Sequence, residues 1–383
     1  MTMNFKEGRW NHEINVTDFV KLNITPYEGD ASFLAGPTER TKAVWNKCLE
    51  ALAEERANNG VRSLDPSTVS TITSFAPGYI DKENEVIVGL QTDELLRRAI
   101  KPFGGIKVVE KACRENGVEV DPKVKDIFTH YRKTHNDGVF DAYTEEIRSF
   151  RSLGFLTGLP DNYARGRIIG DYRRLALYGL DRLIEAKQND LRHLTGPMTD
   201  ARIRLREEVA EQIKALKEIK IMGEQYGLDL SRPATNAREA VQWVYMAYLA
   251  AVKEQDGAAM SLGNVSSFLD IYIEYDMAHN GLDELHAQEL IDQFVIKLRM
   301  VRHLRMQAYT DIFAGDPTWV TEAIGGRFND GRTKVTKTSF RFLQTLYNLG
   351  PSPEPNLTVL WSPQLPEGFK DFCAQVSIDT SSI

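Results

Sequence analysis

The chain has 383 residues, of which 42% are hydrophobic and 26% charged, and its formal net charge is −7. This length and composition support a large buried core, whereas an acidic chain with a pI near 5.7 lacks the basic surface that nucleic-acid binding requires. The sequence shows no apolar run of about eighteen residues and no signal-peptide pattern, and its three cysteines (Cys48, Cys113 and Cys373) are too scattered for a disulfide framework or a zinc site. We therefore expect a cytoplasmic protein that binds no nucleic acid, no membrane and no metal.

The first 110 residues are rich in loops and include one predicted helix over residues 41–58. Downstream the pattern becomes strongly helical. Apolar residues at three- and four-residue spacing predict a helix over residues 199–222. Its apolar stripe consists of Leu205, Val209, Ile213, Leu216 and Ile219.

Two further helices are predicted from their end signals. Asn236 and Glu239 fit a capping box, which opens a helix with an apolar stripe of Ala237, Val241, Val244, Tyr248 and Val252. Residues 283–305 carry acids early and basic residues late, an order that suits the helix dipole. These basic residues are Lys297, Arg299, Arg302 and Arg305. The apolar run 357–361 predicts a buried strand, and many helices with few strands indicate an α/β fold.

Residues 158–174 set four arginines among glycines, next to tyrosine and two acids. A planar guanidinium can hold a carboxylate through two parallel charge-assisted hydrogen bonds, and a neighbouring glycine lets a ligand approach the backbone closely. The run therefore indicates a small-anion site. A basic helix start that makes internal ion pairs is the alternative of similar weight.

Three other irregular segments are where chemistry is expected, because functional residues concentrate on loops. Residues 255–263 are small enough to line a tight pocket, residues 313–319 place two aromatics around a turn, and residues 350–356 form a proline-dense approach to the strand. The sequence contains no Gly-x-Ser-x-Gly, His-Glu-x-x-His or Cys-x-x-Cys motif, and its seven histidines lack ligand spacing. We interpret the histidines as structural or surface residues.

Together these segments resemble the amino-terminal half of the pyruvate formate-lyase (formate C-acetyltransferase) family of glycyl radical enzymes. The resemblance extends from residue 10 to residue 383. The matching runs are residues 25–36, 70–73, 78–82, 103–107, 131–136, 157–178, 257–261, 299–301 and 350–356. Runs this long and this numerous are more specific than any single short motif.

The resemblance implies a helix-rich α/β fold, in which one five-stranded half-barrel and its surrounding helices form the amino-terminal half of a ten-stranded α/β barrel. It also implies a glycyl/thiyl radical reaction of anaerobic glucose fermentation that converts pyruvate and coenzyme A to acetyl-CoA and formate. Coenzyme A is the implied cosubstrate, with no bound metal or prosthetic group. A radical-SAM activating enzyme and a second copy in a homodimer are the implied partners of the full-length protein.

The resemblance assigns site residues by position. Arg167 matches the arginine that binds the pyruvate carboxylate, in agreement with the guanidinium argument. Ala258, Ala259 and Phe313 match the small and aromatic walls of the pyruvate pocket, and Trp319 matches the tryptophan close to the reactive cysteines. Phe140 and Arg151 lie where the family contacts coenzyme A, with an aromatic ring for adenine and a guanidinium for phosphate.

The sequence also departs from the family pattern, because it has no adjacent cysteine pair and no radical-glycine region. We therefore expect no catalytic residue within residues 1–383, which we interpret as a partial domain that binds ligands but does not turn over alone. The alternatives are a 2-ketobutyrate formate-lyase, another glycyl radical enzyme, or a non-catalytic chain that binds keto acid or coenzyme A. Among the other glycyl radical enzymes, the diol dehydratases are disfavoured because they lack an opening like residues 25–36.

Overall fold

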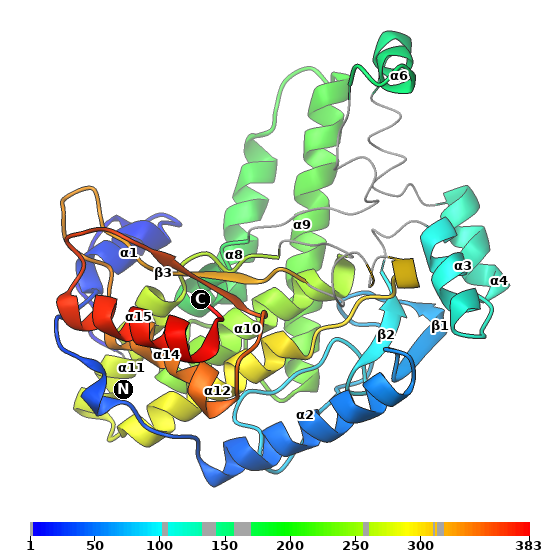
Figure 1. Cartoon of the computed structure of the whole chain (residues 1–383). Coiled ribbons are helices and arrows are strands. Elements are labelled where there is room, and N and C mark those ends of the chain that lie inside the picture. The colour runs from blue at the N-terminus through cyan, green and yellow to red at the C-terminus, as the bar shows by residue number, and fades with distance from the viewer. Residues whose placement is uncertain are drawn as a thin grey trace.

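The structure is a computed structural model that describes residues 3–101, 106–131, 143–156, 170–255, 260–308, 311 and 318–383. Within these ranges helices dominate, and four strands pair in two separate parallel sheets. The helix-rich α/β class predicted from the sequence is thereby confirmed. Figure 1 shows a body of packed helices from which one long helical hairpin projects.

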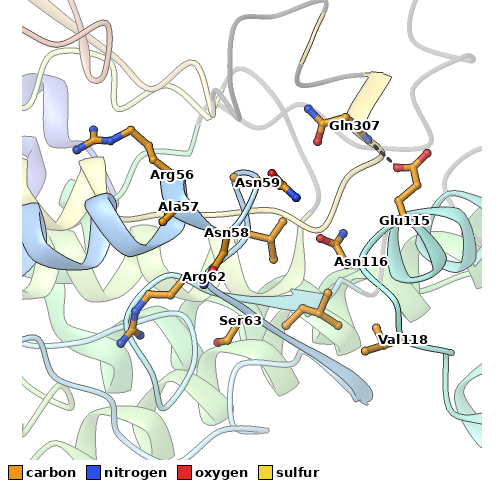
Figure 2. A pocket seen from close by; sticks show the side chains of 13 residues that line it. Arg56, Ala57, Asn58, Asn59, Arg62, Ser63, Glu115, Asn116, Val118 and Gln307 are labelled. Atoms are coloured by element: carbon orange, nitrogen blue, oxygen red, sulfur yellow. Dashed lines mark hydrogen bonds between the residues drawn. The ribbon is translucent and has the colours of Figure 1, made fainter.

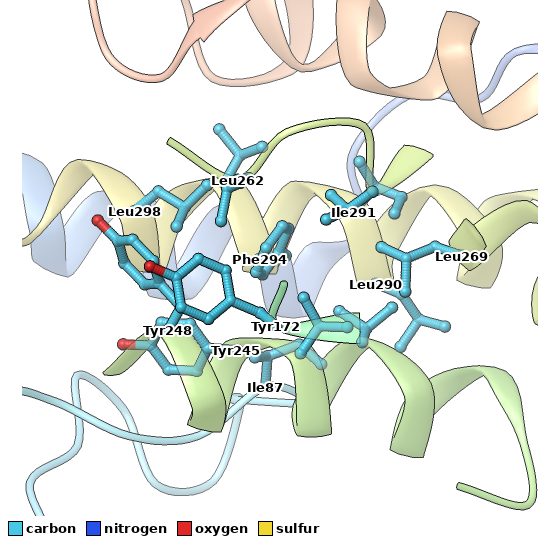
Figure 3. Packing of buried hydrophobic residues seen from close by; sticks show 14 of the residues in the cluster. Ile87, Tyr172, Tyr245, Tyr248, Leu262, Leu269, Leu290, Ile291, Phe294 and Leu298 are labelled. Atoms are coloured by element: carbon cyan, nitrogen blue, oxygen red, sulfur yellow. The ribbon is translucent and has the colours of Figure 1, made fainter. Parts of the chain in front are cut away.

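Helices buried on nearly all sides build the centre of the body. They are α10 (Ala237–Glu254), α11 (Ser266–His279), α12 (Glu284–Arg299) and α14 (Lys337–Asn348). In α12 every residue from Ala287 to Arg299 is buried, as expected for a helix enclosed by others. Figure 3 shows Phe294 of α12 facing Tyr245 of α10, with their ring centroids 6.2 Å apart in an edge-on arrangement.

Buried ion pairs join these helices. The fully buried guanidinium of Arg341 on α14 lies 2.7 Å from the Glu284 carboxylate at the start of α12 and 3.0 Å from that of Glu274 on α11. Lys297 on α12 pairs with Glu85 at 2.9 Å, and both side chains are buried. Because a buried charge without a partner is costly, the Arg341 pairs fix the register of α11, α12 and α14, and the Lys297 pair holds the segment around Glu85 against α12.

The projecting hairpin consists of α8 (Arg173–His193) and α9 (Asp200–Gln225). Gly179 kinks α8 with a φ of +70°, and a Cβ there would lie 2.4 Å from the Arg232 backbone, so only glycine fits. In the stripe predicted for α9, Ile213 is buried but Leu205 is 43% exposed. The outer part of the hairpin extends beyond the body, and the sequence pattern could not show this.

The amino-terminal elements and the last helix cover the body. They are η1 (Arg9–Asn11), α1 (Val16–Asn23), η2 (Ala31–Phe33), α2 (Glu39–Ala57) and α15 (Glu367–Thr380). The bounds of α2 confirm the helix predicted over residues 41–58. The Thr38 side chain accepts a hydrogen bond from the Thr41 amide and so caps this helix.

Both sheets are parallel. Strand β1 (Ser63–Val69) pairs with β2 (Arg97–Ile100), and β3 (Thr321–Gly325) pairs with β4 (Asn356–Leu360). Gly263 forms a parallel bridge with Glu322 of β3, so β3 has a neighbour on each edge. A parallel pair needs a long crossover connection, which α14 supplies between β3 and β4, whereas residues 70–96 connect β1 to β2 without a helix.

A small second core lies beside β1 and β2. It is built on α3 (Ile106–Glu115), α4 (Pro122–Asp126) and the π-helical turn η3 (Ile127–Tyr131). Its buried residues are Ile100, Val109, Ala112, Cys113, Val124, Phe128 and Leu304. Helix α6 (Glu145–Ser152) lies beyond the end of α9 that points away from the body (Figure 1).

The structure corrects the helix predicted over residues 283–305, because α12 ends at Arg299. Its late basic residues do not serve mainly as a surface complement to the helix dipole. Lys297 pairs with buried Glu85, and the Arg299 guanidinium donates to the carbonyl oxygens of Leu349 and Gly350 at 3.2 and 3.0 Å. Charge order along a helix does not reveal burial.

Two finer predictions are half right. Asn236 caps α10 by accepting from the Glu239 amide at 2.8 Å, but the Glu239 carboxylate bonds to Arg232 and Thr235 and does not close a capping box. Residues 357–361 contain most of β4, yet only Leu357 is buried, and Trp361 is 69% exposed. Among the described residues, strand β4 pairs with β3 alone.

Candidate functional site

Five of the residues predicted to form the site lie outside the described residues. They are Phe140, Arg167, Ala258, Ala259 and Phe313. The structure places Trp319 and Arg151, together with the residues that directly flank the other predicted pocket segments. These flanks outline the candidate site.

The flanks of two predicted pocket segments run side by side. The Met260 amide donates to the Thr318 carbonyl at 3.2 Å, and the Leu262 amide donates to the Thr321 carbonyl at 2.8 Å. One step further, the Ala323 amide donates to the Gly263 carbonyl at 2.6 Å. This ladder places the residue that follows Ala258 and Ala259 beside the residue that precedes Trp319.

Arg173 connects the third segment to the first two. Its Nε donates to the Asp171 carboxylate at 2.7 Å, and its Nη1 donates to the Asn264 carbonyl at 3.3 Å. The Asn264 side-chain amide in turn donates to the Ala323 carbonyl on β3 at 2.6 Å. The segment that contains Arg167 thus ends beside the other two. We call residues 170–173, 260–264 and 318–323 the pocket frame.

The sequence-based alternative for the arginine run is correct for Arg173, because this residue makes an internal ion pair. Arg174 is half exposed, with its Nε 3.7 Å from the same Asp171 carboxylate. Neither guanidinium needs a ligand to satisfy its charge. The small-anion prediction therefore rests on Arg165 and Arg167, which lie outside the described residues.

Trp319 occupies a turn between the second pocket segment and β3. Its side chain is half-buried and its backbone has a left-handed φ of +49°, which is uncommon for a bulky residue. The Trp319 amide donates to the Glu354 carboxylate at 2.7 Å, and the buried hydroxyl of Thr318 donates to it at 2.8 Å. Sequence analysis identified the proline-dense segment around Glu354 but assigned no role to this residue.

A second carboxylate holds the other side of the frame. Glu322 of β3 is fully buried and accepts from the amides of Val265 and Ser266 at 2.9 and 2.8 Å, at the start of α11. Burial raises the pKa of the Glu322 carboxyl to about 7, against the opposing effect of these donors and of Arg173. No sequence signal indicated that this glutamate is buried.

Two aromatic side chains, Tyr172 of the frame and Tyr248 of α10, pack against each other. Tyr172 and Tyr248 meet edge-on with ring centroids 5.6 Å apart, and Figure 3 shows their hydroxyl groups pointing to the same side, away from the aliphatic cluster. Burial raises the pKa of Tyr172 to about 12 and that of Tyr248 well above its usual value. Both phenols therefore stay protonated at neutral pH and can act only as neutral hydrogen-bonding groups.

Lys253 is a further residue that sequence analysis missed. It lies in the last turn of α10, its side chain is buried, and burial lowers the pKa of its ammonium group to about 8.

The three cysteines behave as predicted for structural thiols. Burial raises the pKa of Cys48 and Cys373 to about 12 and that of Cys113 to about 11, so all three remain protonated.

Arg151, predicted to contact coenzyme A, lies on α6 with its guanidinium carbon 5.5 Å from the centroid of the Tyr143 ring. Large apolar side chains around it are exposed. They are Phe150 (48%), Leu153 (65%), Phe155 (75%) and Leu156 (45%). Figure 1 shows α6 well away from β3, so Arg151 is not part of the pocket frame.

A wide cleft of about 1250 Å³ lies elsewhere, between the end of α2, the start of β1 and the end of α3 (Figure 2). Its walls carry the side-chain amides of Asn58, Asn59, Asn116 and Gln307. The backbone amide of Gln307 donates to the Glu115 carboxylate at 2.8 Å. Among the described residues, none that was predicted to bind substrate lines this cleft. Volume alone does not identify the site.

Within the described ranges, every helix is too short or too polar to cross a lipid bilayer. The same part of the chain contains no group of three or more histidine, cysteine, aspartate or glutamate side chains arranged to hold a metal ion.

Comparison with known proteins decides the family. The family model described as pyruvate formate lyase-like matches residues 6–383. The chain belongs to the pyruvate formate lyase-like family. It is 58% identical over 384 aligned positions to the protein named formate acetyltransferase from Haemophilus influenzae, a match that covers 99% of this chain and 50% of that protein. The chain thus spans about half the length of this curated relative.

Solved structures of more distant proteins share the fold. The glycerol-bound B12-independent glycerol dehydratase from Clostridium butyricum is 18% identical with a TM-score of 0.70, and the match covers 91% of this chain and 50% of that one. Hydroxyproline dehydratase from Clostridioides difficile, bound to trans-4-hydroxy-L-proline, is 15% identical with a TM-score of 0.68, covering 90% and 50%. At these identities the similarity shows the fold alone.

Proposed function

We propose that this chain forms the amino-terminal part of a formate C-acetyltransferase, which converts pyruvate and coenzyme A to acetyl-CoA and formate. The observation that carries the proposal is the 58% identity to formate acetyltransferase across 99% of the chain. The dehydratases with the same fold are only 15 to 18% identical, which disfavours dehydration as the reaction. We take residues 1–383 as one partial domain of this enzyme.

In this proposal Arg167 binds the substrate carboxylate through its planar fork of donors. Ala258 and Ala259 leave room for a three-carbon keto acid, while Phe313 and Trp319 supply apolar walls that exclude water and oxygen. The convergence of residues 170–173, 260–264 and 318–323 supports the proposal, because each range adjoins one of these segments. One shared pocket for the three segments is consistent with flanks held together in this way.

Coenzyme A is the proposed cosubstrate, and Phe140 and Arg151 are its proposed contacts. The exposed rings around Arg151 can stack on adenine, and its guanidinium can meet phosphate. The radical chemistry requires a radical-bearing glycine region and an adjacent cysteine pair, and this sequence contains neither. A radical-SAM activating enzyme is the proposed partner for this chemistry. We further propose a cytoplasmic homodimer for the full-length protein.

Formate release tests the function. The protein encoded by the complete gene should release formate from pyruvate and coenzyme A after anaerobic activation, whereas the 383-residue chain alone should release none. Formate production by the purified 383-residue chain would overturn the assignment of the missing residues. Preference of the complete protein for 2-ketobutyrate would change the proposed substrate, and binding without turnover would favour a non-catalytic chain.

A further inference from the structure

The Glu354 carboxylate accepts hydrogen bonds from three donors of the turn that contains Trp319. Glu354 lies just before β4, and its Oε2 accepts from the Thr318 hydroxyl at 2.8 Å and from the Val320 amide at 3.2 Å. Its Oε1 accepts from the Trp319 amide at 2.7 Å. Both oxygens of the Glu354 side chain therefore accept hydrogen bonds from this turn.

The same turn is fixed from its other side by backbone bonds. The Thr318 carbonyl accepts from the Met260 amide at 3.2 Å, and the Val320 carbonyl accepts from the Asn356 amide at 2.6 Å. Thr318 and Val320 are buried, so water cannot replace a lost partner easily. The turn is held by both its donors and its acceptors, and this explains how Trp319 keeps a left-handed backbone.

We propose that Glu354 is a positioning residue of the keto-acid pocket, which orients the Trp319 indole by holding the turn over residues 318–320. This inference rests on the proposed function for its catalytic consequence, but its structural part does not. Without the carboxylate, two backbone amides of the turn lose their acceptor. The bonds from Met260 and Asn356 remain, but the Trp319 amide loses the acceptor that holds its backbone left-handed. Relaxation toward a right-handed conformation then moves the indole.

The requirement is for a carboxylate and not only for its shape. Glu354→Gln keeps the size of the side chain but offers one acceptor oxygen where two are used, and its amide nitrogen would face N–H or O–H donors. The substitution should therefore break hydrogen bonds to the backbone of residues 318–320, although it introduces no steric change.

A double-mutant cycle in the complete protein tests the inference. Glu354→Gln, Trp319→Phe and the double variant are compared by kcat/KM for pyruvate and by the Trp319 emission, taken as the difference between each protein and its counterpart with Trp319→Phe. Glu354→Gln should lower kcat/KM about tenfold or more and shift the Trp319 emission to longer wavelength. Because both residues act through one indole, the double variant should be no worse than the more severe single variant.

Glu239→Gln is the matched control. Its carboxylate also accepts from a backbone amide and a threonine hydroxyl, those of Thr235 at 2.9 and 2.8 Å, but at the start of α10. It should lower the Tm without changing pyruvate kinetics or the Trp319 emission. A general loss of stability would affect Glu354→Gln and Glu239→Gln alike.

Effects of Glu354→Gln and Trp319→Phe that multiply would overturn the inference, because the two residues would then act separately. So would unchanged kinetics together with an unchanged Trp319 emission in Glu354→Gln. If the wild-type protein does not turn over pyruvate at all, the proposed function fails, and the emission shift alone then decides whether Glu354 positions Trp319.

Discussion

The pocket frame is fixed by buried hydrogen bonds and an internal ion pair, whereas helix α6 carries mostly exposed side chains. The frame consists of backbone ladders, an internal Arg173–Asp171 pair and two carboxylates that accept buried amides. Helix α6 contributes Arg151 in a setting of exposed rings at the far end of the hairpin. A small substrate must be oriented by rigidly held groups. A large cosubstrate can bind at the surface to exposed side chains that adjust their conformation. The comparison predicts large effects at the frame and small ones at α6.

The largest effect is expected at Arg167. Arg167→Ala in the complete protein should lower kcat/KM for pyruvate by an amount equivalent to about 2–5 kcal/mol, because a charge-assisted bond shielded from water is lost. Arg167→Lys keeps the charge but loses the planar fork, so it should restore activity only in part. Steady-state kinetics of each variant measure the loss in kcat/KM, and a thermal melt shows whether the variant is folded.

Arg174→Ala is the control for Arg167, since its side chain is 51% exposed and its nearest acid, Asp171, is also paired with Arg173. It should leave both the kinetics and the Tm almost unchanged. Arg173→Ala serves less well, because it removes the link between Asp171 and Asn264. If Arg167→Ala keeps wild-type pyruvate kinetics, another arginine must bind the carboxylate.

The next effect concerns the pH dependence of stability at Glu322. Its pKa is raised from 4.5 to about 7 in the folded protein, so its contribution is complete below pH 4.5 and is lost as the pH rises toward 7. Glu322→Gln removes this ionisation. Between pH 5 and 7.5 the wild-type free energy of unfolding should fall by up to about 3 kcal/mol more than that of the variant. Urea unfolding at each pH measures the difference, and parallel curves for the two proteins would show that Glu322 is ionised throughout.

The smallest effect is expected at Arg151. Arg151→Ala should raise the KM for coenzyme A by a few-fold, on the order of 0.5–1 kcal/mol, because an exposed ion pair with phosphate is screened by water and salt. The KM for pyruvate should not change. Arg148→Ala on the same helix is the control. A change in the KM for pyruvate in Arg151→Ala would contradict the separation of the two regions.

Several elements could be predicted from the sequence because their signals are local. The cap at Asn236 and the apolar periodicity of α9 and α10 depend on residues within a few positions of each other. The role proposed for Arg167 came from the family resemblance and from the arginine run. These predictions required no knowledge of how distant segments pack.

The frame itself could not be predicted, because its decisive contacts join distant parts of the chain. Glu354 reaches a turn that precedes it by 34 to 36 positions, and only the register of β3 against β4 brings the two together. Glu322 and Lys297 are both buried, and no local sequence signal indicated this. Burial of a charge depends on the three-dimensional neighbours and leaves no trace in local sequence.

Hydrogen exchange in the presence of pyruvate tests the central claim, which is that the pocket frame surrounds the keto-acid site. The complete protein is used without coenzyme A and without activation, so that pyruvate binds but does not react. Saturating pyruvate should slow exchange in peptides that cover residues 170–178, 260–265 and 318–323, and should leave residues 56–64, residues 115–118 and α6 unchanged. Protection confined to the cleft of Figure 2, with none in the frame, would contradict the account.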